Sequence, residues 1–294
     1  MRLMFIPLFF CTALFANEGF ISVDELKNNI DNPNYVILDI SDSQTYRHGH
    51  IKHAILTNVE DFRENVASYS LMKKPAEVQK LARGLGINDN SIIIIYGHSN
   101  QKDLLKESYL ALALLVNGAK NISILNGGYL AWTFESNILS STSISSVKDG
   151  NFTSVYNPNI LVNLEYMKNN LGKVPMLDAR ATDIYYGISP SKGLKRLGHI
   201  KGAMSSFWND KFLKDETLRN DNELKELFLE GYNLKKDDEV ISYCTSGMEA
   251  SMNWYILYSY FGLKNAKLYD ASMREWGNRD DTPMERFKWE IFSK

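Results

Sequence analysis

Cys244 stands where a cysteine sulfur could act as a nucleophile. It follows residues 239–243, a mostly apolar run typical of a buried strand, and it precedes the polar residues Thr245 and Ser246. A short loop between a buried strand and a helix turns its backbone N–H groups, and the positive end of the helix, toward such a sulfur. Both effects favour a thiolate over a thiol, and the thiolate is the nucleophile. The sequence therefore predicts a reactive sulfur at Cys244.

A buried and inert cysteine is the alternative at this position, because free cysteines commonly behave as small hydrophobic residues. The residues after Cys244 argue against it, since they are Thr, Ser and Gly rather than a continuing apolar stripe. Gly247 also permits a backbone conformation that a Cβ atom would resist. Ligands of open parallel sheets sit beyond the carboxyl ends of the strands, where Cys244 is expected. We therefore favour the reactive interpretation.

The substrate contacts expected around this sulfur come from the loop and from one arginine. The predicted set is Thr245, Ser246, Gly247, Met248, Glu249 and Arg180. A carboxylate at Glu249 would raise the pKa of a thiol that it faced. We expect it to face solvent or a basic neighbour instead.

Local positive charge must meet an anionic substrate, since the net charge of the chain is only −2. The candidates are Arg180, Lys195, Arg196 and Arg274. For Arg180, an ion pair with an acidic residue such as Asp178 is the structural alternative. Lys195 and Arg196 lie in a predicted loop and are expected to be solvated. Basic and acidic residues are interspersed, so no nucleic-acid-binding surface is expected.

A cysteine-based phosphatase is a different class of enzyme with a similar loop. Such an enzyme needs an arginine six residues after the cysteine to hold phosphate through two hydrogen bonds. That position is Ala250 in this chain. The sequence therefore disfavours a phosphatase.

Strands and helices alternate twice along the 294 residues, which suits two domains. Strands are expected at residues 35–39, 92–96 and 122–125, and again at 174–178, 239–243 and 267–269. Helices are expected at residues 75–85 and 104–116, and again at 159–171, 223–229 and 250–261. The four isoleucines at 92–95 are typical of a strand buried on both faces of a parallel sheet. The pattern predicts an α/β fold in which each domain is a mainly parallel sheet flanked by helices.

The two halves also share a sequence signature. Residues 198–203 read Gly-His-Ile-Lys-Gly-Ala and residues 49–54 read Gly-His-Ile-Lys-His-Ala, each after a strand that ends in aspartate. The repetition indicates a duplicated domain, and His199 is expected to anchor a turn. We predict a first domain over residues 19–137, a linker over 138–154 that is rich in serine, and a second domain over 155–294.

Residues 1–16 have the layout of a secretory signal peptide. Arg2 precedes an apolar run that ends near Ala16, and the run is too short to span a bilayer. An uncleaved anchor and a buried first strand are the alternatives. We expect a periplasmic or secreted protein with no stable membrane insertion after signal removal. Removal takes Cys11 away and leaves Cys244 alone, whereas exported proteins that use cysteine for stability keep it in pairs.

Taken in order and in both halves, several segments resemble the tandem-domain sulfurtransferases of the rhodanese family. The segments that carry the resemblance are Leu125–Trp132, Leu177–Arg180, Gly198–Ala203, Tyr243–Gly247 and Tyr269–Asn278. The resemblance implies two rhodanese-like domains, of which the first is non-catalytic and the second catalytic.

The resemblance also implies a reaction. The Cys244 thiolate attacks the outer sulfur of a small anionic donor, with thiosulfate as the first choice, and sulfite leaves. The resulting persulfide passes its sulfur to cyanide or to a thiol, which is the exchange chemistry of a thiolate attacking sulfur. The resemblance implies no metal and no organic cofactor.

The chain departs from the family pattern at several positions. His98 lies in the first-domain loop that corresponds to the cysteine loop, and we expect a polar loop role for it rather than catalysis. Ile184 stands where family members often carry an arginine, and Glu249 where many carry threonine. Thr245 and Ser246 match neither the thiosulfate-preferring nor the mercaptopyruvate-preferring loop. A 3-mercaptopyruvate sulfurtransferase and a non-catalytic sulfur-binding or interaction scaffold are therefore the alternatives.

Overall fold

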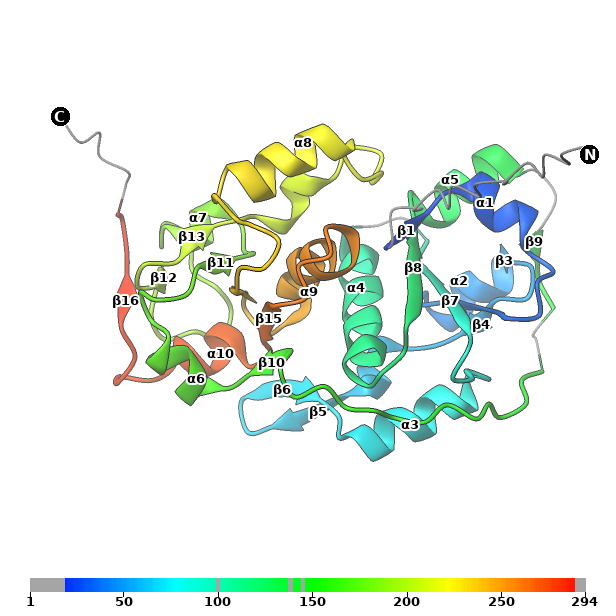
Figure 1. The fold of residues 1–294 in the computed structure, drawn as a ribbon, viewed down its shortest axis with the longest axis horizontal. Helices are drawn as coiled ribbons and strands as arrows, with labels where there is room; N and C mark the ends of the chain where they lie inside the picture. The colour runs from blue at the N-terminus through cyan, green and yellow to red at the C-terminus, as the bar shows by residue number, and fades with distance from the viewer. Residues whose placement is uncertain (1–18, 99–100, 137–139, 144–145, 289–294) are drawn as a thin grey trace, which may run out of the picture.

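The computed structural model describes residues 19–98, 101–136, 140–143 and 146–288. It contains two five-stranded sheets of the same plan, one in each half of the chain (Figure 1). The first sheet has the order β1-β8-β7-β2-β4, formed by Phe20–Ile21, Asn121–Leu125, Ile92–Tyr96, Tyr35–Asp39 and Ile55–Leu56. The second has the order β10-β15-β14-β11-β13, formed by Leu161–Val162, Ala266–Tyr269, Val240–Tyr243, Met176–Asp178 and Met204–Ser205. All neighbouring strands in both sheets pair in parallel, which confirms the predicted α/β fold.

Both faces of the first sheet are buried, as the isoleucine run of β7 predicts. Ile93 and Ile95 belong to one hydrophobic core, and Ile94 and Tyr96 belong to another on the opposite face. The first half contains the helices α1 (Val23–Asn28), α2 (Ser43–His48), η1 (Val59–Phe62), α3 (Pro75–Gly84), α4 (Gln101–Val116) and α5 (Gly128–Ser136). The second half contains α6 (Leu164–Asn169), α7 (Thr182–Tyr185), η2 (Trp208–Lys211), α8 (Asp221–Lys225), η3 (Glu226–Glu230), α9 (Met248–Tyr255), η4 (Ile256–Tyr260) and α10 (Ser272–Trp276).

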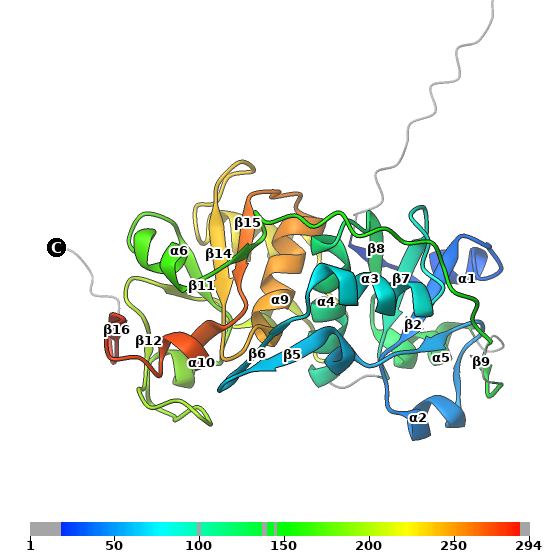
Figure 2. The ribbon, with the colours of Figure 1, turned by 90° about the horizontal axis from the view of Figure 1, so that it is seen from below.

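Three antiparallel ribbons complete the described part of the chain. They are β3 (His50–Ile51) with β9 (Ser140–Ser141), β5 (Arg63–Val66) with β6 (Tyr69–Met72), and β12 (His199–Ile200) with β16 (Met284–Glu285). The β5–β6 hairpin extends from the first half toward α10 of the second half (Figure 2).

The two halves pack against each other through α4 and α9, which lie side by side at the centre of the molecule (Figure 1, Figure 2). Ser108 of α4 and Ser251 of α9 share a hydrogen bond of 2.7 Å. One hydrophobic core contains residues of both helices and of both sheets. Residues of the first half can therefore contribute to a site in the second.

The repeated Gly-His-Ile segments have the same local structure in both halves. His50 stacks on Tyr46 and His199 stacks on Tyr185, with ring centroids 3.7 and 3.8 Å apart. Each histidine Nδ1 lies within hydrogen-bonding distance of the backbone carbonyl of its tyrosine, at 2.7 and 2.9 Å. Each tyrosine hydroxyl donates at 2.6 Å to the carbonyl of the alanine that ends the segment. The expectation that His199 anchors a turn is confirmed.

The helix expected over residues 159–171 is shorter than predicted and follows a strand. Leu161–Val162 form β10, which pairs with β15, and α6 begins only at Leu164. Asn163 separates the two elements, and its side chain accepts a hydrogen bond from the Tyr166 N–H at 2.9 Å. The prediction is wrong at this point because so short an apolar run does not distinguish a strand from a helical turn.

The expected signal peptide, residues 1–16, lies outside the described residues. None of the described helices is long and apolar enough to cross a membrane. Where the structure describes the expected linker, it runs along the first half: β9 pairs with β3, and Phe152 is buried.

Candidate active site around Cys244

Cys244 follows directly after β14, and its side chain is fully buried. The chain turns at Gly247, where φ is 86°, and α9 begins at Met248. This turn places the Gly247 N–H so that it donates a hydrogen bond to the Cys244 Sγ at 3.1 Å. The strand, short loop and helix expected at the sulfur are therefore present.

The carbonyl groups of the same loop are bound by donors from other elements. The N–H groups of Met273 and Arg274, in α10, donate to the backbone carbonyls of Cys244 and Thr245, respectively, at 3.0 Å each. The Arg63 Nη2, from β5 of the first half, donates to the Ser246 carbonyl at 2.8 Å. A trans peptide group directs its C=O and its N–H in opposite directions. Arg63 thus holds the peptide group whose N–H reaches the sulfur.

Ser272 and Arg63 are site residues that sequence reasoning missed. The Ser272 Oγ accepts a hydrogen bond from the Cys244 N–H at 3.1 Å and lies 3.9 Å from the Sγ. The signal for Ser272 was its place in the 269–278 segment that resembles the family. Arg63 has no comparable signal, because it belongs to the other half of the chain.

The structure corrects the expected ionisation of Cys244. Burial, and second the Glu249 carboxylate, raise the pKa of the Cys244 thiol to about 12. Hydrogen bonds from the N–H groups of Ala250 and Ser246 and from the Ser272 side chain lower this pKa but are outweighed. The prediction of a thiolate at rest is therefore wrong for this structure, since the cost of burying a charge exceeds the gain from these donors.

Glu249 is partly exposed, and its carboxyl group interacts electrostatically with the Cys244 sulfur and with the Arg180 guanidinium. Burial raises the pKa of the Glu249 carboxyl group, whereas the Thr245 N–H, the Arg180 charge and a hydrogen bond from Cys244 lower it. The Thr245 N–H donates to Glu249 Oε2 at 3.4 Å. The expected basic neighbour is present only as an electrostatic influence of Arg180, which pairs with Asp178, and the Asp178 charge acts on Glu249 in the opposite direction. Contrary to expectation, the carboxyl group also acts on the sulfur.

Replacing Glu249 by glutamine is expected to lower the pKa of the Cys244 thiol, because the change removes a negative charge near the sulfur and leaves burial unaltered. The thiolate fraction at pH 8 then rises, by about tenfold for each unit by which the pKa falls. The rate at which iodoacetamide alkylates Cys244, measured against pH, reports the pKa of the thiol. The midpoint of this pH profile should move to lower pH. Glu230→Gln, which changes an exposed glutamate of η3, should keep the wild-type profile. A shared midpoint in both variants would contradict the electrostatic role of Glu249.

Arg180 is buried, with 1% of its surface exposed, and its Nε and Nη2 donate to neighbouring groups. Its Nε donates to Asp178 Oδ1 at 2.8 Å, and its Nη2 donates to Asp178 Oδ2 at 2.5 Å. The Nη2 also donates to the Gly198 carbonyl at 2.8 Å. The structure thus favours the structural alternative for Arg180, because its guanidinium is buried in an ion pair with Asp178.

The other candidate cations differ in their surroundings. Lys195 is exposed, as expected. Arg196 is not a solvated loop residue, because its guanidinium donates to three backbone carbonyls, those of Trp276, Gly277 and Thr282. Arg274 is partly exposed, and no described residue forms an ion pair with it. Within the described ranges, no group of three or more His, Cys, Asp or Glu side chains is placed to hold a metal ion.

The first half has a glycine where the second has its cysteine. Tyr96 ends β7 as Tyr243 ends β14, and each hydroxyl accepts a hydrogen bond from the isoleucine N–H of its own Gly-His-Ile segment. Gly97 therefore corresponds to Cys244. A Cβ atom at Gly97 would lie 2.5 Å from the Asp103 Cβ, so a cysteine side chain does not fit there.

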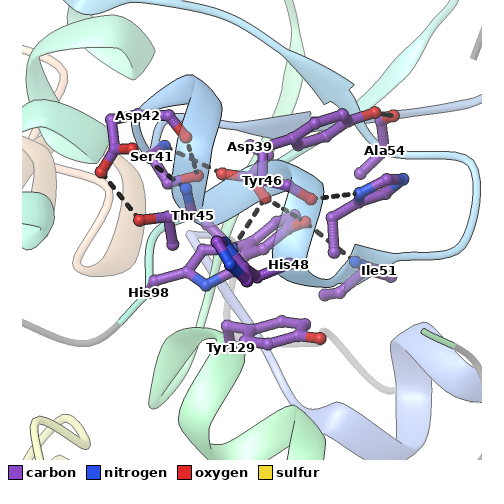
Figure 3. Close-up of polar contacts among 12 residues, drawn as sticks. Asp39, Ser41, Asp42, Thr45, Tyr46, His48, Ile51, Ala54, His98 and Tyr129 are labelled. Atoms are coloured by element: carbon purple, nitrogen blue, oxygen red, sulfur yellow. Dashed lines mark hydrogen bonds and ion pairs between the residues drawn. The ribbon is translucent and has the colours of Figure 1, made fainter. Parts of the chain in front are cut away.

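His98, next to this glycine, belongs to a buried polar cluster (Figure 3). Its Nε2 lies 2.9 Å from Oδ2 of Asp39, and its ring stacks on Tyr129 with centroids 4.1 Å apart. The Tyr96 hydroxyl donates to the same Asp39 oxygen at 2.6 Å. These contacts support a structural role for His98.

Replacing His98 by alanine is expected to lower the free energy of unfolding by about 1–3 kcal/mol, because the buried Asp39 carboxylate loses a partner. The turnover rate should change by less than about twofold, since we expect no catalytic role for His98. Urea unfolding and the turnover rate measure the two effects. His48→Ala, at an exposed histidine of α2, is the control and should alter neither. A large loss of turnover in a stably folded His98→Ala protein would overturn this assignment.

Comparisons with known proteins identify the family of the chain. The family model for the rhodanese-like domain matches residues 22–135 and 163–279. The chain is 27% identical over 285 residues to the sulfur carrier protein TtuD of Thermus thermophilus, covering 92% of this chain and 97% of that protein. It is 26% identical over 288 residues to the 3-mercaptopyruvate sulfurtransferase of Escherichia coli K12, covering 93% of this chain and all of that protein.

The crystal structure of SseA from Escherichia coli, a 3-mercaptopyruvate sulfotransferase, has the same fold. It superposes with a TM-score of 0.74 at 23% identity, covering 87% of this chain and 98% of that chain. The two family matches also confirm the duplication predicted from the repeated segments. With one match in each half, the chain belongs to the rhodanese family and carries two rhodanese-like domains.

Proposed function

We propose that the protein is a sulfurtransferase that moves a sulfane sulfur from thiosulfate to cyanide or a thiol through a persulfide on Cys244. The observation that carries the proposal is the geometry at the sulfur. Cys244 follows a central strand of a parallel sheet, the Gly247 N–H donates to its Sγ at 3.1 Å, and the loop carbonyls are bound elsewhere. Preorganised N–H donors of this kind stabilise negative charge that develops on sulfur during transfer.

The chemistry consists of two displacements at sulfur. In the first, the Cys244 thiolate attacks the outer sulfur of thiosulfate. A new S–S bond forms as the S–S bond of the donor breaks, and sulfite leaves with the electron pair. In the second, cyanide or a thiolate attacks the outer sulfur of the persulfide and releases the Cys244 thiolate. Cyanide yields thiocyanate, and a thiolate becomes a persulfide in turn.

The buried thiol must ionise before the first displacement. Burial is the largest cause of its raised pKa, so any movement of the loop that admits water or a donor also lowers that pKa. We propose that entry of the donor and ionisation of Cys244 are coupled in this way. Arg63 and Arg274, which both hydrogen-bond to the loop, supply the positive charge that an anionic donor requires.

Steady-state rates with two donors and cyanide as acceptor test the proposal. We expect a higher kcat/KM with thiosulfate than with 3-mercaptopyruvate. The reverse order would favour the alternative 3-mercaptopyruvate sulfurtransferase, which the similarity to the Escherichia coli enzyme supports. Absence of turnover with both donors would favour a non-catalytic sulfur-binding or interaction scaffold, for which the burial of Cys244, which raises the pKa of its thiol, is the supporting observation.

We also propose, from residues 1–16 alone, that the protein is exported to the periplasm or secreted. Cell fractionation with N-terminal sequencing tests this. We expect an exported form that starts at Asn17, and an intact N-terminus in the cytoplasmic fraction would contradict it.

A further inference from the structure

A polar cavity of about 250 Å³ lies between the two halves, beside the Cys244 loop. Its walls come from the β5–β6 hairpin of the first half, from Ser246 of the loop and from Arg274 of α10. Arg63 and Arg274 are the two charged residues among the lining residues, and none of the lining residues is acidic. A small cavity with two cationic residues in its wall attracts anions.

Arg63 enters this cavity wall from the first half. Its side chain is 8% exposed, and its guanidinium lies 4.8 Å above the Tyr109 ring. The Nη2 binds the Ser246 carbonyl, and the Nη1 lies 3.7 Å from the Glu60 carboxylate, whose side chain is 60% exposed. Asp270 adds a second negative charge nearby. The Nε is buried and has no hydrogen-bond partner among the described residues, so the bonding capacity of this cation is incompletely used.

Arg274 forms another part of the cavity wall. Its backbone N–H donates to the Thr245 carbonyl at 3.0 Å, which fixes its position relative to the loop. Its guanidinium lies against Gly193, where a Cβ atom would be only 2.1 Å from the Nη1. No described carboxylate forms an ion pair with it. The glycine thus leaves room for a guanidinium that is free to bind a ligand.

We propose that this cavity holds the anionic end of the sulfur donor between Arg63 of the non-catalytic domain and Arg274 of the catalytic domain. The shared chemistry is an oxyanion, either the sulfonate of thiosulfate or the carboxylate of a mercapto acid, which guanidinium groups bind through charge-assisted hydrogen bonds. The inference rests on the proposed function, because it locates the substrate of Cys244. It makes the first domain a direct part of the donor site.

The position of Ser246 in the cavity wall links donor binding to access. Ser246 lies two residues after the buried Cys244, and its carbonyl is held by the Arg63 Nη2. An oxyanion that binds the Nη2 competes with this carbonyl. This competition would weaken the hold of Arg63 on the loop and so give the donor access to the buried sulfur, while the Gly247 N–H that donates to the Sγ remains part of the loop.

Calorimetric titration of thiosulfate into a Cys244→Ser protein measures this binding without turnover. Arg274→Gln and Arg63→Gln are introduced separately into the same background. Arg47→Gln, at an exposed arginine of α2, is the matched control. We expect each of the first two changes to raise the Kd by about 10-fold or more, as for the loss of a charge-assisted hydrogen bond, and Arg47→Gln to leave it unchanged. A parallel titration with 3-mercaptopyruvate shows which anion depends more strongly on the two arginines.

Circular dichroism of each variant checks its folding. Arg274→Gln is the decisive variant if Arg63→Gln does not fold, since Arg274 is partly exposed and meets the loop through its backbone. An equal Kd in the Arg274→Gln and Arg47→Gln proteins would overturn the proposal, and so would the absence of binding by both donors. Failure of the proposed function has a different signature: binding that depends on the arginines in a wild-type protein that transfers no sulfur.

Discussion

A Cys244→Ser protein is expected to fold normally and to lose sulfur transfer by at least about 10⁴-fold, the scale seen when a nucleophile is removed from an enzyme. A serine hydroxyl is a weak nucleophile toward sulfur and does not form a persulfide. The smaller oxygen fits the buried site, and it remains an acceptor for the Gly247 N–H that now binds the Sγ. The rate of thiocyanate formation from thiosulfate and cyanide measures the loss.

Cys11→Ser is the matched control, because Cys11 is the other of the two cysteines in the chain. It lies in the expected signal peptide, so its replacement should leave the turnover rate unchanged. Turnover in Cys244→Ser close to that of the control would show that the nucleophile is another group.

Gly247→Ala is expected to disrupt both the stability and the chemistry of the loop. The φ of 86° at Gly247 is strained for any residue with a Cβ, at a cost of about 1–3 kcal/mol. The new Cβ would also lie 2.2 Å from Oδ1 of Asp270. Asp270 cannot move aside freely, because it accepts hydrogen bonds from the Met72 N–H and the Tyr109 hydroxyl. The loop must shift instead, which takes the Gly247 N–H away from the Cys244 Sγ.

We expect Gly247→Ala to lower the sulfur-transfer rate by about 100-fold, the effect of losing one preorganised donor. Gly202→Ala is the control for backbone strain, since Gly202 has a φ of 80° and no atom within 4 Å of the added Cβ. It should be destabilised in urea unfolding but keep its turnover rate. Equal rates in the two variants would show that the loop geometry is not needed for transfer.

The fold was predictable where its signals are local. Four consecutive β-branched isoleucines are typical of a strand buried on both faces, and Ile93 and Ile94 do lie in different cores. Ser22 caps the first helix, because its side chain accepts a hydrogen bond from the Glu25 N–H, three residues on, at 3.1 Å. The boundary at residues 159–163 was not predictable, because β10 forms only when β15 is beside it. That pairing depends on a segment about a hundred residues away, as the register of Leu161 with Leu268 shows.

The candidate site was likewise predictable only where its signals are local in the sequence. The loop after Cys244 and the position of Glu249 in it can be predicted from consecutive residues of the sequence. Arg63 is not, because its contact with Ser246 forms only after two domains pack together. The state of the sulfur was mispredicted for a related reason. N–H donors can be inferred from a strand–loop–helix sequence, but the burial that outweighs them is a property of the assembled structure.

Intact mass spectrometry after incubation with thiosulfate tests the persulfide on Cys244 most directly. We expect the mass to increase by one sulfur atom, to return to its starting value when cyanide is added, and to stay constant in Cys244→Ser. An unaltered mass of the wild-type protein after treatment with thiosulfate and with 3-mercaptopyruvate would contradict sulfur transfer through this residue.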